Sequence, residues 1–225
     1  GGLAAGVSTL AKLLNPNIKV IGVEPAGASC MKASLDAGKV ITLPDVNTIA
    51  DGTAVKRVGE TIFPYCKENI HKIITVDDNE LIDAFLDMVE NHKMIVENSG
   101  LLTVAALKQL KVKDKKIVSI LSGGNMDVIT MSSVVQQGLV QRSRIFTVSV
   151  LLPDKPGELV RVASIIAEAS GNVIKLEHNQ FVSINRKATV ELRITIEAFG
   201  HEHKEEIVKK LDEAGLRPRI VKVNI

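Results

Sequence analysis

Two glycine-containing motifs, at opposite ends of the first half of the chain, could bind a ligand together. The apolar run of residues 117–121 ends in Ser-Gly-Gly-Asn at residues 122–125. Glycine there lets the backbone approach a planar ligand, and Ser122 offers a neutral hydroxyl. The chain begins with a Gly-Gly pair that opens into an apolar, helix-like segment. Such a turn holds phosphate with backbone N–H groups. We therefore predict two edges of a site for an aromatic cofactor that carries a phosphate.

Composition excludes several classes of protein. A chain of 225 residues predicts one or two domains, and 45% hydrophobic residues is normal for a globular core. It contains no apolar run of membrane-spanning length and no secretory signal pattern at its start. The two cysteines form neither a disulfide framework nor a metal cluster, which favours the reducing cytoplasm. A net charge of +2, one Tyr and no Trp give no indication of nucleic-acid binding.

The predicted elements of the first part alternate between helix and strand. We expect helices over residues 4–14, 29–37 and 101–110. A further helix should follow Asp78, which would be its N-cap. Strands are expected over residues 19–23, 73–76 and 117–121. The helix after Asp78 should bury one apolar face, made by Leu81, Ile82, Phe85, Met88 and Val89. Alternation of this kind predicts parallel strands covered by helices, with ligands beyond the carboxyl ends of the strands. Glu24 and Ser122 fall at such ends.

The pattern changes near residues 141–144. From Ile145 onwards the chain reads β-α-β-β-α-β, with a hairpin turn at Asn185-Arg186 and a last strand over residues 219–225. This order predicts a ferredoxin-like unit. In its first strand, alternate residues should face the core, namely Phe146, Val148, Val150 and Leu152. In its first helix, the inward residues should be Leu159, Val162, Ala163, Ile166 and Ala169.

Five segments, in order, carry a resemblance to a known family. They are GGLAAG, IGVEPAGAS, TIADGTAV, MIVENSGLLTVAAL and LSGGNMD. In this order they resemble the C-terminal half of a fold-type II pyridoxal-phosphate enzyme, above all the threonine dehydratases (threonine ammonia-lyases) and serine racemases. The remainder, with DKPGEL and a later Gly-Asn-Val, resembles an ACT domain. The resemblance implies the fold class α/β: residues 1–140 as an incomplete catalytic domain with a parallel sheet, and residues 141–225 as a ferredoxin-like βαββαβ ACT regulatory domain.

The resemblance implies pyridoxal 5′-phosphate as the cofactor and assigns residues to it. Backbone amides at the start of the chain would bind the phosphate, and Ser122 would hydrogen-bond the pyridine nitrogen. A hydroxyl does not keep that nitrogen protonated, so the ring is a weaker electron sink, which suits β-elimination. An acidic residue would line the pocket, and the glycine turn would lie beneath the ring. The implied cofactor residues are Gly1, Gly2, Leu3, Glu97, Ser122, Gly123 and Asn125.

A cation site is also implied by the serine racemases. Glu24 and the Ala28 carbonyl match two of its ligands, but Cys30 stands where the third is acidic. Because hard divalent ions prefer oxygen, a monovalent ion or no ion are the alternatives to Mg²⁺ or Ca²⁺. Glu24 could instead cap the next helix.

Several motifs have plainer interpretations. Glu97 could pair with Lys93, and the initial Gly-Gly could be a tag remnant. Taken alone, Ser-Gly-Gly is equally typical of an ordinary turn. His201 and His203 share a loop, where simple solvation is the alternative to metal binding.

The implied reaction is β-elimination of L-threonine (or serine) to 2-oxobutanoate and ammonia, which would place the protein in amino-acid metabolism and isoleucine biosynthesis. The family's Schiff-base lysine and its Ser-Gly-Asn-His motif lie before the glycine loop, and no lysine here has that context. We therefore expect this chain to be part of a longer enzyme and to be inactive alone.

The ACT resemblance implies allosteric regulation by an amino acid, isoleucine or valine, in a homodimer or homotetramer. The implied effector residues are Asp154, Pro156, Gly157, Leu159 and Asn172. The exposed backbone edge of residues 172–183 is a further candidate. Two alternatives stay open: a non-catalytic amino-acid-sensing ACT fragment, and a serine racemase-like enzyme.

Overall fold

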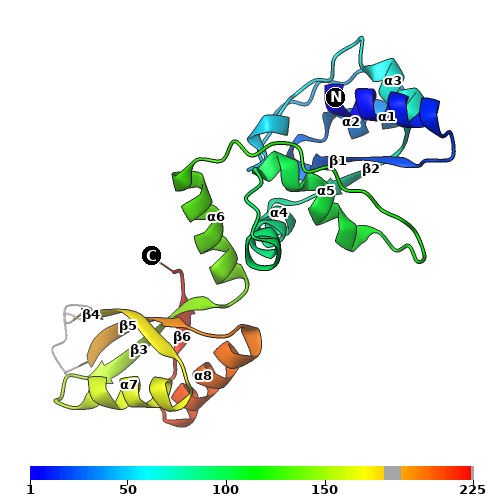
Figure 1. The fold of residues 1–225 in the computed structure, drawn as a ribbon. Helices are drawn as coiled ribbons and strands as arrows, with labels where there is room; N and C mark the ends of the chain where they lie inside the picture. Colours follow the sequence, from blue (N-terminus) through cyan, green and yellow to red (C-terminus); the bar gives the residue numbers. More distant parts are fainter. Residues whose placement is uncertain (180–188, 224–225) are drawn as a thin grey trace. The chain divides into compact units, whose positions relative to one another are not determined.

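The chain folds into two compact units, residues 1–135 and 136–225. The computed structural model describes residues 1–179 and 189–223 (Figure 1). Each unit has a hydrophobic core of its own. In this described part of the chain, no helix is long and apolar enough to cross a membrane.

The first unit is built of alternating helices and strands, as its sequence pattern predicts. Its regular elements are α1 (Gly2–Leu14), β1 (Val20–Pro25), α2 (Cys30–Ala37), α3 (Phe63–Asn69), β2 (Ile70–Val76) and α4 (Asp78–Asp87). The strands β1 and β2 pair in parallel, with Glu24 opposite Thr75 near the carboxyl ends of both. The prediction of parallel strands is therefore confirmed, and Glu24 lies at the end where α/β sheets bind ligands.

Asp77, and not Asp78, caps α4. The Asp77 carboxylate accepts a hydrogen bond from the Glu80 N–H, and the Glu80 carboxylate accepts one from the Asp77 N–H. This is a complete capping box. The predicted cap is wrong by one residue, because two adjacent aspartates satisfy the same sequence signal. The predicted apolar face of the helix is confirmed, with Leu81 and Phe85 fully buried.

Two expected elements of the first unit differ in the structure. Residues 117–121 form no strand within the described chain, and Val118 is 88% exposed. A strand requires the hydrogen bonds of a neighbouring strand; here the Thr103 hydroxyl donates to the Ile120 carbonyl, 3.0 Å away. The helix expected over residues 101–110 is broken into short turns, with α5 (Leu102–Ala105) between two 3₁₀ turns. The β-branched Thr103 and Val104 weaken a regular helix there.

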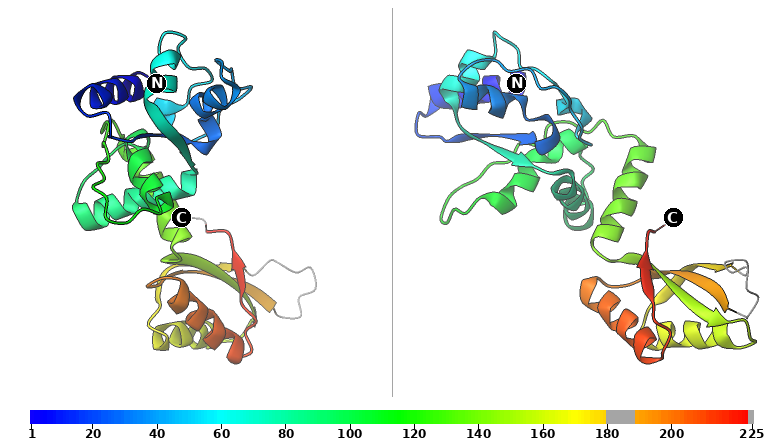
Figure 2. Two further views of the ribbon diagram at one scale, coloured as in Figure 1. Left: turned by 90° about the vertical axis from the view of Figure 1, so that its right-hand side faces the viewer. Right: turned by 180° about the vertical axis from the view of Figure 1, so that it is seen from behind.

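The second unit is a four-stranded antiparallel sheet with helices on one face (Figures 1 and 2). After α6 (Val128–Gln141) come β3 (Ile145–Pro153), α7 (Glu158–Glu168), β4 (Asn172–Asn179), β5 (Thr189–Glu197), α8 (His201–Glu213) and β6 (Arg219–Val221). The sheet order β4-β5-β3-β6 is that of a ferredoxin-like unit. The predicted turn at Asn185-Arg186 and the end of the last predicted strand, residues 224–225, lie outside the described residues.

The core of the second unit follows the predicted alternation. Phe146, Val148, Val150 and Leu152 are all buried, as are Val162 and Ile166 on α7. Leu159, expected to point inward, is 41% exposed instead. It lies in the first turn of α7, which begins at Glu158, where it borders an open hollow next to the sheet.

Candidate functional site

The Glu97 carboxylate lies directly against the Gly-Gly turn that follows Ser122. One of its oxygens, Oε2, accepts a hydrogen bond from the Asn125 N–H at 3.0 Å. The Glu97 N–H donates to the Gly123 carbonyl at 3.4 Å. Gly123 has φ +107°, and a Cβ there would lie 2.3 Å from Glu97 Oε1. Only glycine satisfies both constraints, so the structure brings together three of the residues expected to hold the cofactor.

The alternative interpretation of Glu97 as the partner of Lys93 is wrong. The Lys93 ammonium donates to the Glu90 carbonyl, and the Glu97 carboxylate instead receives a backbone N–H from Asn125. Glu97 is half-buried. Its negative charge therefore faces the glycine turn.

A third segment, residues 48–53, completes this centre. A Cβ on Gly52 would lie 2.9 Å from Ser99 Oγ and 3.8 Å from Glu97 Oε1. The Ser99 hydroxyl and the side-chain amide oxygen (Oδ1) of Asn98 are buried and have no hydrogen-bond partner among the described residues. Neither residue was predicted to belong to the site. Their position next to Glu97 in the sequence was the one available indication, because the sequence does not show that a polar atom is buried without a hydrogen-bond partner. Unpaired buried polar atoms of this kind are uncommon in folded proteins, which makes this position a candidate for a functional role.

The start of the chain forms a separate cluster of contacts. Gly1 caps α1, and its carbonyl accepts a hydrogen bond from the Ala5 N–H at 2.9 Å. A Cβ on Gly1 would lie 2.8 Å from the Met31 side chain. The first N–H groups of a helix have no partner within the helix, so those of Gly2 and Leu3 are available to an anion. No described contact joins them to the Glu97 centre.

Glu24 caps α2. Its two carboxylate oxygens accept hydrogen bonds from the Met31 and Lys32 N–H groups, both at 2.8 Å. Burial raises the pKa of the Glu24 carboxyl, while the two backbone N–H groups partly offset this shift. The structure therefore shows Glu24 in the alternative role, as a cap of the helix that follows it. Ala28 is buried, and the described residues contain no group of three His, Cys, Asp or Glu side chains that could hold a metal ion.

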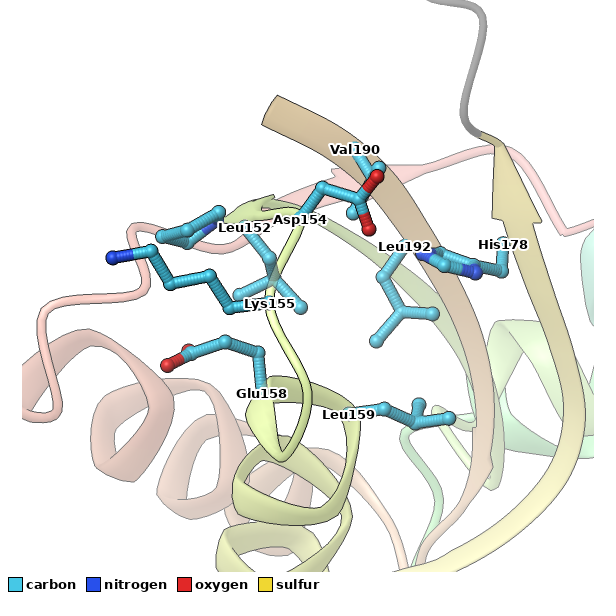
Figure 3. A pocket seen from close by; sticks show the side chains of 9 residues that line it. Leu152, Asp154, Lys155, Glu158, Leu159, His178, Val190 and Leu192 are labelled. Carbon is cyan, nitrogen blue, oxygen red and sulfur yellow. The ribbon is translucent and has the colours of Figure 1, made fainter. Parts of the chain in front are cut away.

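The turn between β3 and α7 borders a small hollow of about 50 Å³ (Figure 3). Its lining is an apolar floor with a polar rim, made by Leu152, Pro153, Asp154, Lys155, Glu158, Leu159, His178, Val190 and Leu192. Of the expected effector residues, Asp154 and Leu159 line it, and Pro156 and Gly157 belong to the same turn. Asn172 lies at the opposite end of β4 from His178, about 20 Å along the strand, where its side chain donates to Glu197. His178 was not predicted; it is paired with Leu192 across the sheet.

A family model described as "Pyridoxal-phosphate dependent enzyme" matches residues 1–123 of the chain. This match includes every segment of the Glu97 centre up to Gly123 and the whole of the N-terminal glycine turn. The chain belongs to the pyridoxal-phosphate-dependent enzyme family.

Relatives within this family share sequence along almost the whole chain. The L-threonine ammonia-lyase of Geobacter sulfurreducens is 37% identical over 224 residues, which are 99% of this chain and 56% of the relative. That of Thermotoga maritima is 35% identical over 222 residues, 98% of this chain and 55% of the relative. The chain therefore spans little more than half the length of these curated relatives, and it matches the C-terminal part of the first.

Two solved structures have a similar fold. One is the processed form of threonine deaminase isoform 2 from Solanum lycopersicum, with TM-score 0.57 and 40% identity, covering 60% of this chain and 41% of that chain. The other is maize serine racemase, with TM-score 0.55 and 37% identity, covering 64% of this chain and 45% of that chain.

The residues of this family member fit pyridoxal phosphate. Gly123 and Gly124 are exposed and carry no side chain, so the backbone of this turn can approach a flat ring. The unpaired Ser99 hydroxyl and Asn98 oxygen lie at the same centre, and the Glu97 carboxylate is held there by the backbone.

Proposed function

We propose that the whole protein is a pyridoxal-phosphate-dependent threonine ammonia-lyase and that this chain supplies the C-terminal part of its catalytic domain. The observation that carries the proposal is the position of the Glu97 carboxylate. It lies against Gly123, the residue after Ser122, and accepts a hydrogen bond from the Asn125 N–H. The names of the relatives support the substrate, L-threonine. The products are 2-oxobutanoate and ammonia.

The bound cofactor supplies the electron sink for loss of the α-proton and of the β-hydroxyl group. The Ser122 hydroxyl would hydrogen-bond the ring nitrogen and, because a hydroxyl carries no negative charge, would not stabilise the pyridinium. The N–H groups of Gly1, Gly2 and Leu3 would hold the phosphate at the start of α1. Glu97, fixed by the Asn125 N–H, presents its carboxylate to the edge of the pocket. We infer from the family resemblance that the Schiff-base lysine lies in a part of the whole protein outside this chain.

The experiment that tests this function is Ser122→Ala in the whole protein. Loss of one hydrogen bond to the ring should weaken cofactor binding roughly tenfold, measured by fluorescence titration with pyridoxal phosphate, and should lower 2-oxobutanoate formation. Ser133→Ala, at an exposed position of α6, is the matched control and should bind like the wild type. Unchanged cofactor affinity in Ser122→Ala would contradict the assignment.

Serine racemase activity is the second candidate, and the similarity to the maize serine racemase favours it. The two activities differ in product. Incubation with L-serine and chiral chromatography would give D-serine for a racemase, whereas the proposed lyase gives pyruvate and ammonia.

We further propose that the second unit is an ACT domain that binds isoleucine or valine at the hollow beside α7. An amino acid places an ammonium near Asp154 or Glu158 and an aliphatic side chain on Leu152, Leu159 and Leu192, all of which line the hollow. The hollow is far smaller than the roughly 300–1,000 Å³ of a typical ligand site. A second copy of the unit would therefore complete it, which favours a homodimer or homotetramer.

Leu159→Asp tests the effector site because it places a charge on the apolar part of the hollow while leaving the catalytic unit untouched. The response of the activity to isoleucine should be lost, and activity without isoleucine should stay as in the wild type. Calorimetry should give reciprocal effects of isoleucine and threonine on each other's affinity. An intact isoleucine response would refute the site. A protein that binds isoleucine but takes up no cofactor would support the non-catalytic sensor instead.

A further inference from the structure

We propose that Asp78 and Asn98 are positioning residues that clamp residues 48–52 onto the Glu97 centre; this inference rests on the proposed function. Neither residue is among those expected to bind the cofactor, and the sequence pattern assigned Asp78 to a helix cap. In the structure both side chains instead bind the backbone of one residue, Ile49.

Asp78 binds the start of the segment. Its Oδ1 accepts a hydrogen bond from the Thr48 hydroxyl at 2.6 Å, and its Oδ2 accepts one from the Ile49 N–H at 3.1 Å. The Thr48 hydroxyl in turn accepts from the Ala50 N–H at 3.1 Å. Hydrogen bonds to an ionised carboxylate are stronger than those between neutral groups. Asp78 is free for this role because Asp77 already caps α4.

Asn98 binds the other side of the same residue. Its side-chain amide donates to the Ile49 carbonyl at 3.0 Å. Ile49 lies outside the strands, so both its N–H and its C=O are bound by side chains rather than by a neighbouring strand. Asn98 is 4% exposed and Ala50 is fully buried. The two contacts therefore hold the peptide groups on both sides of Ile49, from two different elements.

The clamp sets the position of Gly52. The Thr53 N–H and hydroxyl both bond the Ala50 carbonyl at 3.0 Å, so the turn at Asp51–Thr53 is anchored to the clamped segment. This turn carries Gly52 over Ser99 Oγ and beside Glu97 Oε1. Asn98 lies between Glu97 and Ser99 in the chain. A shift of Ile49 would thus change the wall that faces the carboxylate and the unpaired hydroxyl.

The test compares Asp78→Ala with Asp77→Ala in the whole protein. The two substitutions are adjacent and both weaken the first turn of α4, but only Asp78 contacts residues 48–49. In the absence of cofactor, hydrogen exchange of a peptide covering residues 47–53 should speed up in Asp78→Ala and stay near wild type in Asp77→Ala. Fluorescence titration with pyridoxal phosphate should give about tenfold weaker binding for Asp78→Ala and about twofold or less for Asp77→Ala.

In Asp78→Asn, both the hydrogen exchange of residues 47–53 and the affinity for pyridoxal phosphate should stay close to those of the wild type. Its carboxamide oxygen can accept from the Ile49 N–H while its NH₂ donates to the Thr48 hydroxyl. Equal exchange in the two alanine variants would overturn the clamp. Faster exchange in Asp78→Ala with unchanged cofactor affinity would overturn the positioning role. If the wild-type protein takes up no pyridoxal phosphate, the proposed function and the positioning role both fail, while the exchange comparison still decides whether the clamp exists.

Discussion

At the scale of single residues, the contact between Glu97 and Gly123 is the most restrictive feature of the site. Gly123 has φ +107°, and a Cβ would meet the Glu97 carboxylate at 2.3 Å. Gly123→Ala should therefore lower the free energy of unfolding by about 2 kcal/mol, measured by urea denaturation, and should abolish cofactor uptake. Gly38→Ala is the control, since Gly38 also has positive φ, +69°, but open space around it. Equal cofactor binding by the two variants would show that the Glu97 contact is unimportant.

At the scale of elements, the pairing of β3 with β5 places Glu191 beside a hydroxyl. The Ser149 hydroxyl donates to the Glu191 carboxylate at 2.6 Å, and Arg193 lies 3.1 Å from it. These two contacts, the first above all, hold the pKa of Glu191 below its ordinary value of 4.5. The stabilisation is present above pH 4.5 and is lost as the pH falls through the lower pKa of the folded state.

The free energy of unfolding of the second unit should accordingly fall with pH below 4.5. Glu191→Gln should make that dependence shallower, as measured by urea denaturation between pH 3 and 6. Glu205→Gln, at an exposed position on α8, is the control and should follow the wild-type curve. Identical slopes in wild type and Glu191→Gln would exclude this contribution.

At the scale of the whole molecule, each unit buries its own core, so the two should respond separately to core substitutions. Ile194 is 1% exposed in the core of the second unit and Leu81 is fully buried in the first. Ile194→Ala should lower the stability of residues 136–225 by about 2–5 kcal/mol and leave hydrogen exchange in residues 1–135 unchanged. Leu81→Ala should do the opposite. Accelerated exchange in both units from either substitution would show that they unfold together.

Features that depend on neighbours within one turn or along one strand could be predicted from the sequence. The buried face of α4 and the apolar alternation of β3 follow from periods of 3.6 and 2 residues. The order of five motifs was enough to indicate the family. The βαββαβ order of the second unit followed from the same periods.

The partner of each polar side chain could be identified only in the folded structure. Asp78 contacts a hydroxyl 30 residues earlier, and Asn98 a carbonyl 49 residues earlier, so no local pattern could distinguish Asp78 from the capping Asp77. Likewise, the sequence allowed Glu24 either to bind a cation or to cap a helix. In the structure, both of its carboxylate oxygens accept hydrogen bonds from N–H groups of α2. Residues 117–121 have the composition of a strand but pair with no strand in the described part of the chain. The type of a residue limits which groups it can bind, whereas its actual partner depends on how distant parts of the chain pack together.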